Sequence, residues 1–90
     1  MRTLFVGYDL NKPGQNYTDL IDALKSYPAW WHYLDSTWLI RTNDSVSDIR
    51  DHLGALIDSG DELLVMEVTG TTWASKGLSK KANDWLYSSL

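Results

Sequence analysis

Residues 4–11, with the sequence LFVGYDLN, indicate the first strand of the fold and the point where it ends. Four apolar or small residues are followed by Tyr8 and then by the carboxylate of Asp9. A short apolar run of this kind favours a mostly buried strand over a helix. We therefore predict a first strand over residues 3–9. Asp9 marks the point where this strand leaves the core, which makes it the first residue to consider for chemistry.

The composition predicts one small domain with a real core. The chain has 90 residues, of which 43% are hydrophobic, and it includes five tryptophans and five tyrosines that bring large buried areas. It contains no cysteine, which excludes disulfides, thiol catalysis and thiolate zinc sites. A small domain without disulfides is typical of a reducing compartment, so we expect a cytoplasmic protein.

Hydropathy and net charge limit the classes of partner that the chain can bind. No apolar run approaches the roughly 20 residues that span a bilayer, and the opening MRTLFVGYDL breaks at Asp9 before it forms a secretory core. We therefore expect no membrane partner. The net charge of −4 argues against broad, charge-driven nucleic-acid binding. A net charge of −4 is compatible with local basic patches. Lys76, Lys80 and Lys81 form one near the C-terminus, but such lysines usually belong to a solvated helix face.

Helical periodicity marks two internal segments. After the turn residues NKPGQN at 11–16, apolar residues one helical turn apart predict a helix over about 16–26, which Pro28 stops. The same spacing predicts a second helix over about 46–58. The residues that carry the two patterns are Tyr17, Leu20, Ile21 and Leu24, and then Val46, Ile49, Leu53, Leu56 and Ile57. Ser45 and Asp48 have the form of a capping box at the start of the second helix.

Two further stretches have strand composition. WWHYLDSTWLIRT (30–42) is aromatic and β-branched and divides at Asp35-Ser36, which predicts two short strands or one broken strand. LLVMEVTG (63–70) is the strongest strand by composition and closes the core. The order strand, helix, strand, strand, helix, strand predicts an α+β, ferredoxin-like βαββαβ fold with an antiparallel sheet. In that topology the first and third strands are central neighbours. Asp9 then meets the corner at Ser36 and Thr37.

The C-terminal residues 70–90 form a tail to this core, which covers about 2–69 of a single domain spanning 1–90. After Gly77 the tail fits a short helix whose narrow apolar stripe comprises Leu78, Ala82, Trp85 and Leu86. This helix covers the open face of the sheet or docks on a partner.

Two short motifs resemble known families. Tyr8-Asp9 at the end of the first strand and Ser36-Thr37-Trp38 within LDSTWLI (34–40) resemble the small CRISPR-associated adaptation subunit and its relatives, the VapD toxins. The element order is similar over roughly residues 2–69. The chain also looks like small bacterial proteins labelled "SinR-like". No helix-turn-helix pattern accompanies that label here, so we infer no transcriptional repression from it.

The resemblance implies a homodimer in which the two copies of Asp9 face each other. In nucleases of these families, paired aspartates hold a divalent cation that activates water, and hard oxygen ligands suit Mg²⁺ or Mn²⁺. This sequence departs from the families in one respect, because Lys12 stands alone before an acidic helix where a basic segment is common. The departure weakens nucleic-acid binding, since phosphate contacts supply much of the affinity.

Each candidate site residue also has a structural interpretation. Asp9 is a metal ligand and catalytic residue in one interpretation, and in the other it accepts backbone hydrogen bonds in the turn that follows. Ser36 is an auxiliary catalytic group or a residue that satisfies the backbone of a bulge. His32 and His52 are not spaced as a metal-binding pair, so neither is predicted to be a ligand. No phosphate-cradling loop or zinc helix is found.

The aromatic series Trp30, Trp31, Tyr33 and Trp38 is the candidate interface. Strand alternation sends Trp31 and Tyr33 to the face opposite Trp30 and His32. One set fills the core, and the other lies on the open face of the sheet. That face forms a dimer interface, is covered by the tail through Trp73 and Trp85, or stacks on bases. We prefer dimerisation and predict a dimeric interaction module without strong catalysis. The alternative is a metal-dependent endonuclease that uses Asp9 of both subunits on RNA or DNA.

Overall fold

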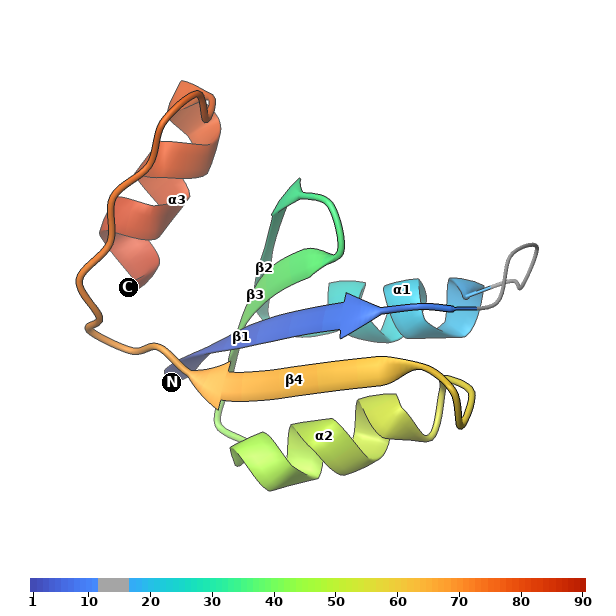
Figure 1. Ribbon diagram of the computed structural model, residues 1–90. Helices are drawn as coiled ribbons and strands as arrows, with labels where there is room; N and C mark the ends of the chain where they lie inside the picture. Colours follow the sequence, from blue (N-terminus) through green and yellow to red (C-terminus); the bar gives the residue numbers. More distant parts are fainter. Residues whose placement is uncertain (12–16) are drawn as a thin grey trace.

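A computed structural model describes residues 1–11 and 17–90 (Figure 1). Along these residues the elements are β1 (Arg2–Asp9), α1 (Thr18–Lys25), β2 (Ala29–Leu34), β3 (Thr37–Thr42), α2 (Val46–Gly54), β4 (Glu62–Glu67) and α3 (Lys80–Ser89). The predicted turn at 11–16, including Lys12, lies outside the described residues except for Asn11. In the part of the chain that is described, no helix is both long and apolar enough to cross a bilayer.

The strands form one antiparallel sheet in the order β2-β3-β1-β4. The predicted α+β class is confirmed, and the arrangement is consistent with a ferredoxin-like fold. The ends of β1 and β3 also meet as predicted: Gly7 is opposite Thr37, and the Tyr8 amide donates a hydrogen bond to the Ser36 carbonyl at 3.1 Å. The carboxyl end of β1 therefore lies beside the β2–β3 turn.

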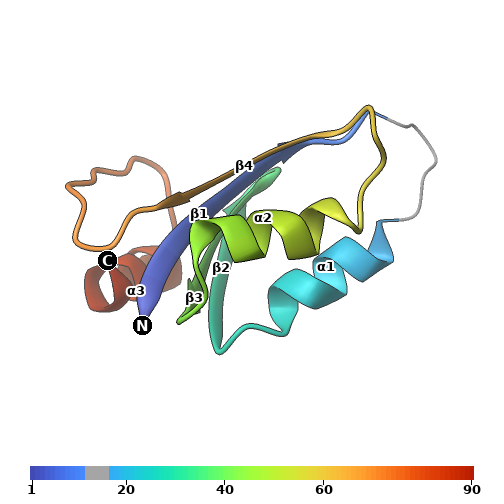
Figure 2. The same cartoon turned by 90° about the horizontal axis from the view of Figure 1, so that it is seen from below.

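The main core lies between one face of the sheet and helices α1 and α2 (Figure 2). Its fully buried members are Leu4, Val6, Leu20, Leu24, Trp38, Ile40, Ile49 and Leu53. The helical members recur every four residues, which places them on the stripe that faces the sheet. The Ser45 hydroxyl accepts a hydrogen bond from the Asp48 amide at 3.1 Å, so the predicted N-terminal cap of α2 is confirmed.

Helix α2 is shorter than predicted, because it ends at Gly54 and not at 58. Glycine loses more backbone freedom in a helix than other residues and is common where helices end. The chain tightens there, since the Leu56 amide donates to the Leu53 carbonyl at 3.0 Å. Leu56 and Ile57 still pack against the main core, which explains why their spacing resembled a continued helix.

The segment before β4 is organised by the carboxylate of Asp61. Its Oδ1 accepts from the Asn11 amide at 2.8 Å, and its Oδ2 accepts from the Tyr17 hydroxyl and the Asp58 amide, both at 2.9 Å. One carboxylate thereby joins the residue after β1, the start of α1 and the α2–β4 connection. These bonds hold the first residue of β4 against the last residue of β1.

Candidate functional site

Helix α3 covers only part of the second face of the sheet. Ala82 and Leu86 pack on Trp31 and Leu39, and the Trp31 Nε1–H donates to the Ala82 carbonyl at 3.1 Å. The tail forms the predicted short helix, and of the two alternatives it covers the sheet: it lies over the β2–β3 side, opposite α1 and α2 (Figure 2). The Trp31 side chain is only 3% exposed as a result.

A second set of polar contacts attaches the end of α3. The Arg41 guanidinium donates to the Ser89 carbonyl at 2.7 Å, and the Thr3 hydroxyl donates to the same oxygen. A cation at the C-terminal end of a helix is favourable because the last carbonyls carry partial negative charge. These contacts position α3 over the row that contains Thr3 and Arg41, which are register partners in β1 and β3.

Toward β4 and the β2–β3 turn, side chains of the same face are exposed. Leu34, Thr37, Gly7 and Leu64 follow one another across β2, β3, β1 and β4 by their register. Leu64 is 55% exposed and the neighbouring Met66 is 44% exposed. We define the open patch as the apolar side chains of Phe5, Tyr33, Leu34, Leu64 and Met66 around Gly7. Exposed apolar clusters of this kind mark binding sites more often than scattered surface leucines do.

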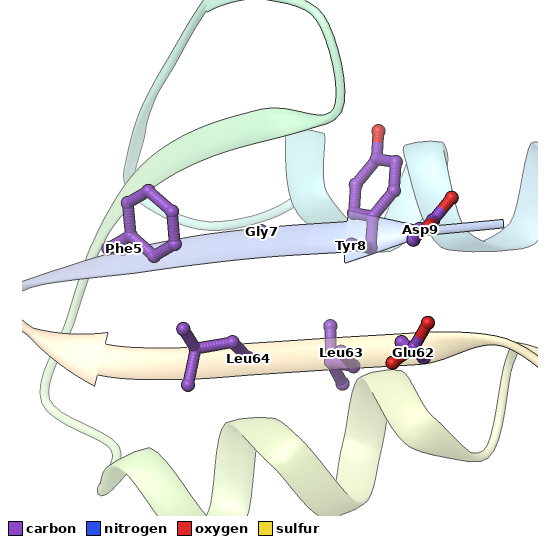
Figure 3. A pocket seen from close by; sticks show the side chains of 7 residues that line it. All are labelled: Phe5, Gly7, Tyr8, Asp9, Glu62, Leu63 and Leu64. Atoms are coloured by element: carbon purple, nitrogen blue, oxygen red, sulfur yellow. The ribbon is translucent and has the colours of Figure 1, made fainter.

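Gly7 gives the open patch its shape. A Cβ atom at this position would lie 2.8 Å from Cε1 and 2.9 Å from Cζ of Phe5, because the Phe5 ring leans over the glycine. The ring, Leu64 and the bare backbone of Gly7 border a surface hollow of about 410 Å³ (Figure 3). Its remaining lining residues are Tyr8, Asp9, Glu62 and Leu63.

Two carboxylates stand at one end of this hollow. Asp9 and Glu62 are register partners at the end of β1 and the start of β4. Both are exposed, and directly paired residues have Cβ atoms about 4.5–5.5 Å apart. Within residues 1–11 and 17–90, neither carboxylate takes part in an ion pair or hydrogen bond with another side chain. The site therefore combines an apolar floor with an acidic end.

Glu62 was not among the predicted site residues. Asp9 lies where the sequence predicted, at the exit of a central strand, but its neighbour comes from a strand more than fifty positions away. The expected strand order could have predicted this neighbour, because the start of the last strand in this topology lies beside the end of the first. The alternative role of Asp9 in the turn at 11–16 falls outside the described residues.

Ser36 lies in the tight turn between β2 and β3. Its φ of 55° is in the left-handed region, where a serine is uncommon, and its carbonyl receives the Tyr8 amide. Asp9 is the next residue along β1, so the two predicted catalytic candidates approach each other through the backbone. The described hydrogen bond of Ser36 joins the turn to β1.

The four aromatic candidates divide between the two faces as alternation predicted. Trp38 is fully buried in the main core, where His32 stacks on it at 3.9 Å and Trp30 lies 5.4 Å away between ring centroids. Trp31 is buried under α3, and its ring lies 5.3 Å from that of Tyr33. Of the four candidates, Trp30 and Tyr33 are exposed, on opposite faces of the sheet, whereas Trp31 and Trp38 are buried within the chain.

The electrostatics around the aromatic core affect one histidine. Burial lowers the pKa of His32, while Asp35 acts to raise it and Lys25 to lower it further. Lys25 also places its Nζ 5.6 Å from the centroid of the Trp30 ring, within range of a cation–π contact. Among the described residues, no group of three or more histidine, cysteine, aspartate or glutamate side chains is arranged to hold a metal ion.

No protein-family model matches this chain, and no solved structure matches it.

Proposed function

We propose that this protein is a small homodimeric interaction module with a ferredoxin-like domain, in which a second copy covers the open patch. The observation that carries the proposal is the division of the second sheet face. Helix α3 buries Trp31 and Leu39 on the β2–β3 side, whereas Leu64 and Met66 of β4 on the same face remain about half exposed. A sheet with an uncovered apolar region gains free energy when a partner removes it from water, by about 25 cal/mol per Å².

A second copy suits this face for two reasons. A two-fold axis through the patch places the same apolar surface on both sides, so one sequence supplies both halves of the interface. The face offers little to nucleic acid, because its charged residues at the hollow are Asp9 and Glu62 and the chain carries a net charge of −4. We accordingly propose that the protein acts by binding, without strong catalysis. We also propose that it acts in the cytoplasm.

The proposal is tested with two substitutions of the same kind. Leu64→Asp introduces a charge into the open patch, whereas Tyr87→Asp introduces one on α3 at a side chain that is 78% exposed. Light scattering after size-exclusion chromatography should show a dimer for the wild type and for Tyr87→Asp, and a monomer for Leu64→Asp. A wild type that elutes as a monomer at high micromolar concentration is the result that refutes the proposal.

A metal-dependent endonuclease is the second candidate, and the pairing of Asp9 with Glu62 favours it. One chain supplies two exposed carboxylates at a hollow, and a dimer supplies more. Carboxylates suit Mg²⁺ or Mn²⁺, and such an ion would lower the pKa of a bound water so that it attacks a phosphodiester. Asp9 would act from both subunits, with Ser36 as an auxiliary group. This candidate is in keeping with the resemblance to the adaptation subunits and VapD toxins.

The two candidates are separated by one mutant series. Under the endonuclease hypothesis, wild-type protein with Mn²⁺ cleaves RNA or DNA, while Asp9→Asn and Glu62→Gln abolish cleavage and Asp22→Asn on exposed α1 does not. Manganese should also broaden the amide signals near Asp9 in the wild type only. Intact nucleic acid together with uniform broadening would eliminate the endonuclease and leave the interaction module.

A further inference from the structure

Strand β4 ends the sheet, and one of its backbone edges points away from β1 (Figure 1). The Val68 amide donates to the Thr3 carbonyl at 2.8 Å, which continues the β1–β4 register by one step. Antiparallel pairs alternate between residues that bond to the neighbour and residues that face outward. Glu62, Leu64 and Met66 therefore bond to β1. The N–H and C=O groups of Leu63, Val65 and Glu67 face outward.

This edge lacks the usual protection against strand pairing. Natural edge strands are blunted by lysine, proline, bulges or inward-pointing charges. In β4 the four central residues are Leu-Leu-Val-Met, without a charge or a proline, and the β1–β4 register runs without a shift. The only charges are the acids at the two ends, Glu62 and Glu67. The backbone groups of the edge are thus available to a further strand.

Side-chain sites flank the edge on both faces. On the α2 side, Val46, Ser47 and Arg50 form a second hollow of about 180 Å³ with residues 63–65 of β4. Val46 is exposed at its rim. On the other side, Leu64 and Met66 of the open patch stand beside the same edge. A strand added here would place alternate side chains in the hollow and against these two residues.

Charge identifies the occupant. If a second copy paired through its own β4 in antiparallel fashion, the Glu62 end of one copy would lie beside the Glu67 end of the other. Four carboxylates would then gather at the two ends of the pair, and Arg2, which lies 3.7 Å from Glu67, would relieve only part of the repulsion. A strand with basic residues at its ends meets the same acids favourably. The charges at the ends of β4 therefore favour a strand of another protein over the β4 of a second copy.

We propose that the outer edge of β4 binds an extended segment of another protein as a fifth strand, with an apolar centre and lysine or arginine at each end. Main-chain hydrogen bonds to Leu63, Val65 and Glu67 supply the pairing, and the α2 hollow selects the inward side chains. The homodimer proposed above covers a face of the sheet and this segment pairs with a backbone edge, so the two proposals are tested separately although both involve Leu64 and Met66.

The test uses the acetylated and amidated peptide Lys-Val-Ile-Val-Thr-Arg with the uniformly labelled 90-residue chain. Saturable binding should protect the amides of Leu63, Val65 and Glu67 from hydrogen exchange. The amides of Glu62, Leu64 and Met66 should be protected in the free protein already. Methylation of alternate peptide nitrogens on the pairing edge should abolish binding, because it removes the donors.

The role of charge is tested by reversing the charges at the ends of β4 and at the ends of the peptide. The double variant Glu62→Lys, Glu67→Lys should bind this peptide about tenfold more weakly, since each surface charge pair contributes about 0.2–1 kcal/mol. The same variant should prefer the peptide with glutamate at both ends. The matched control Asp22→Lys, Asp35→Lys makes an equal change of net charge at exposed sites away from β4 and should bind like the wild type.

Three results would overturn the inference. The first is the absence of saturable peptide binding, and the second is binding that survives methylation of the peptide nitrogens. The third is protection of Leu63, Val65 and Glu67 that rises with protein concentration alone, which would assign the edge to a second copy. A monomeric protein that still binds the peptide would refute the homodimer and support the edge site, so the two proposals fail separately.

Discussion

Replacing Leu86 with alanine should detach α3 and leave the rest of the domain folded. Leu86 is 6% exposed and packs with Ala82 on Trp31 and Leu39. This cluster shares no buried residue with the main core on the other face of the sheet. Removing the buried leucine side chain costs about 2–5 kcal/mol. A loss of about 3 kcal/mol raises the population of the detached helix roughly a hundredfold, at 1.4 kcal/mol for each factor of ten.

Hydrogen exchange followed by mass spectrometry measures this separation. In Leu86→Ala, amides of α3 should exchange faster while those of α1 and α2 keep their protection. The matched control is Leu53→Ala, which removes the same atoms from the fully buried interior of the main core. That variant should accelerate exchange throughout the sheet and both core helices. Equal loss of protection in α1, α2 and α3 in Leu86→Ala would refute the division of the molecule into two separately packed layers.

Two further predictions concern the main core and the hollow. Burial lowers the pKa of His32 in the folded state. As the pH falls below the ordinary histidine pKa of about 6.5, the unfolded state therefore binds more protons, and the free energy of unfolding should decrease. His32→Phe should flatten the pH dependence of Tm in this window. Gly7→Ala should cost about 1–3 kcal/mol in urea unfolding because its Cβ would meet the Phe5 ring at 2.8 Å. The same substitution in a Phe5→Ala background should cost less, and an unchanged cost would contradict the steric explanation.

Local patterns in the sequence predicted the elements and the pairing of strands. The apolar run at Leu4 and Val6 became the buried side of β1, and the spacing of Ile49 and Leu53 became the buried stripe of α2. Alternation also predicted correctly that Trp31 and Trp30 point to opposite faces. These features depend on residues within a few positions of one another, which is why a single sequence reveals them.

The candidate site depends on contacts that are distant in sequence and was predicted only in part. Asp9 was identified by its place after a strand, but Glu62 joins it only through the β1–β4 register. The burial of Trp31 likewise depends on where α3 docks, and no local pattern specifies which part of the sheet the tail covers. The premature end of α2 at Gly54 shows a further limit, because Leu56 and Ile57 keep apolar spacing in a segment that is no longer helical.

Sedimentation equilibrium of the wild-type protein determines whether a second copy covers the open patch. The proposal predicts that the mass rises from that of one 10.3 kDa chain to twice that value as the concentration reaches the high micromolar range. Leu64→Asp, measured alongside, should stay at the mass of one chain. A wild type that remains a single chain throughout this range would show that no second copy covers the open patch.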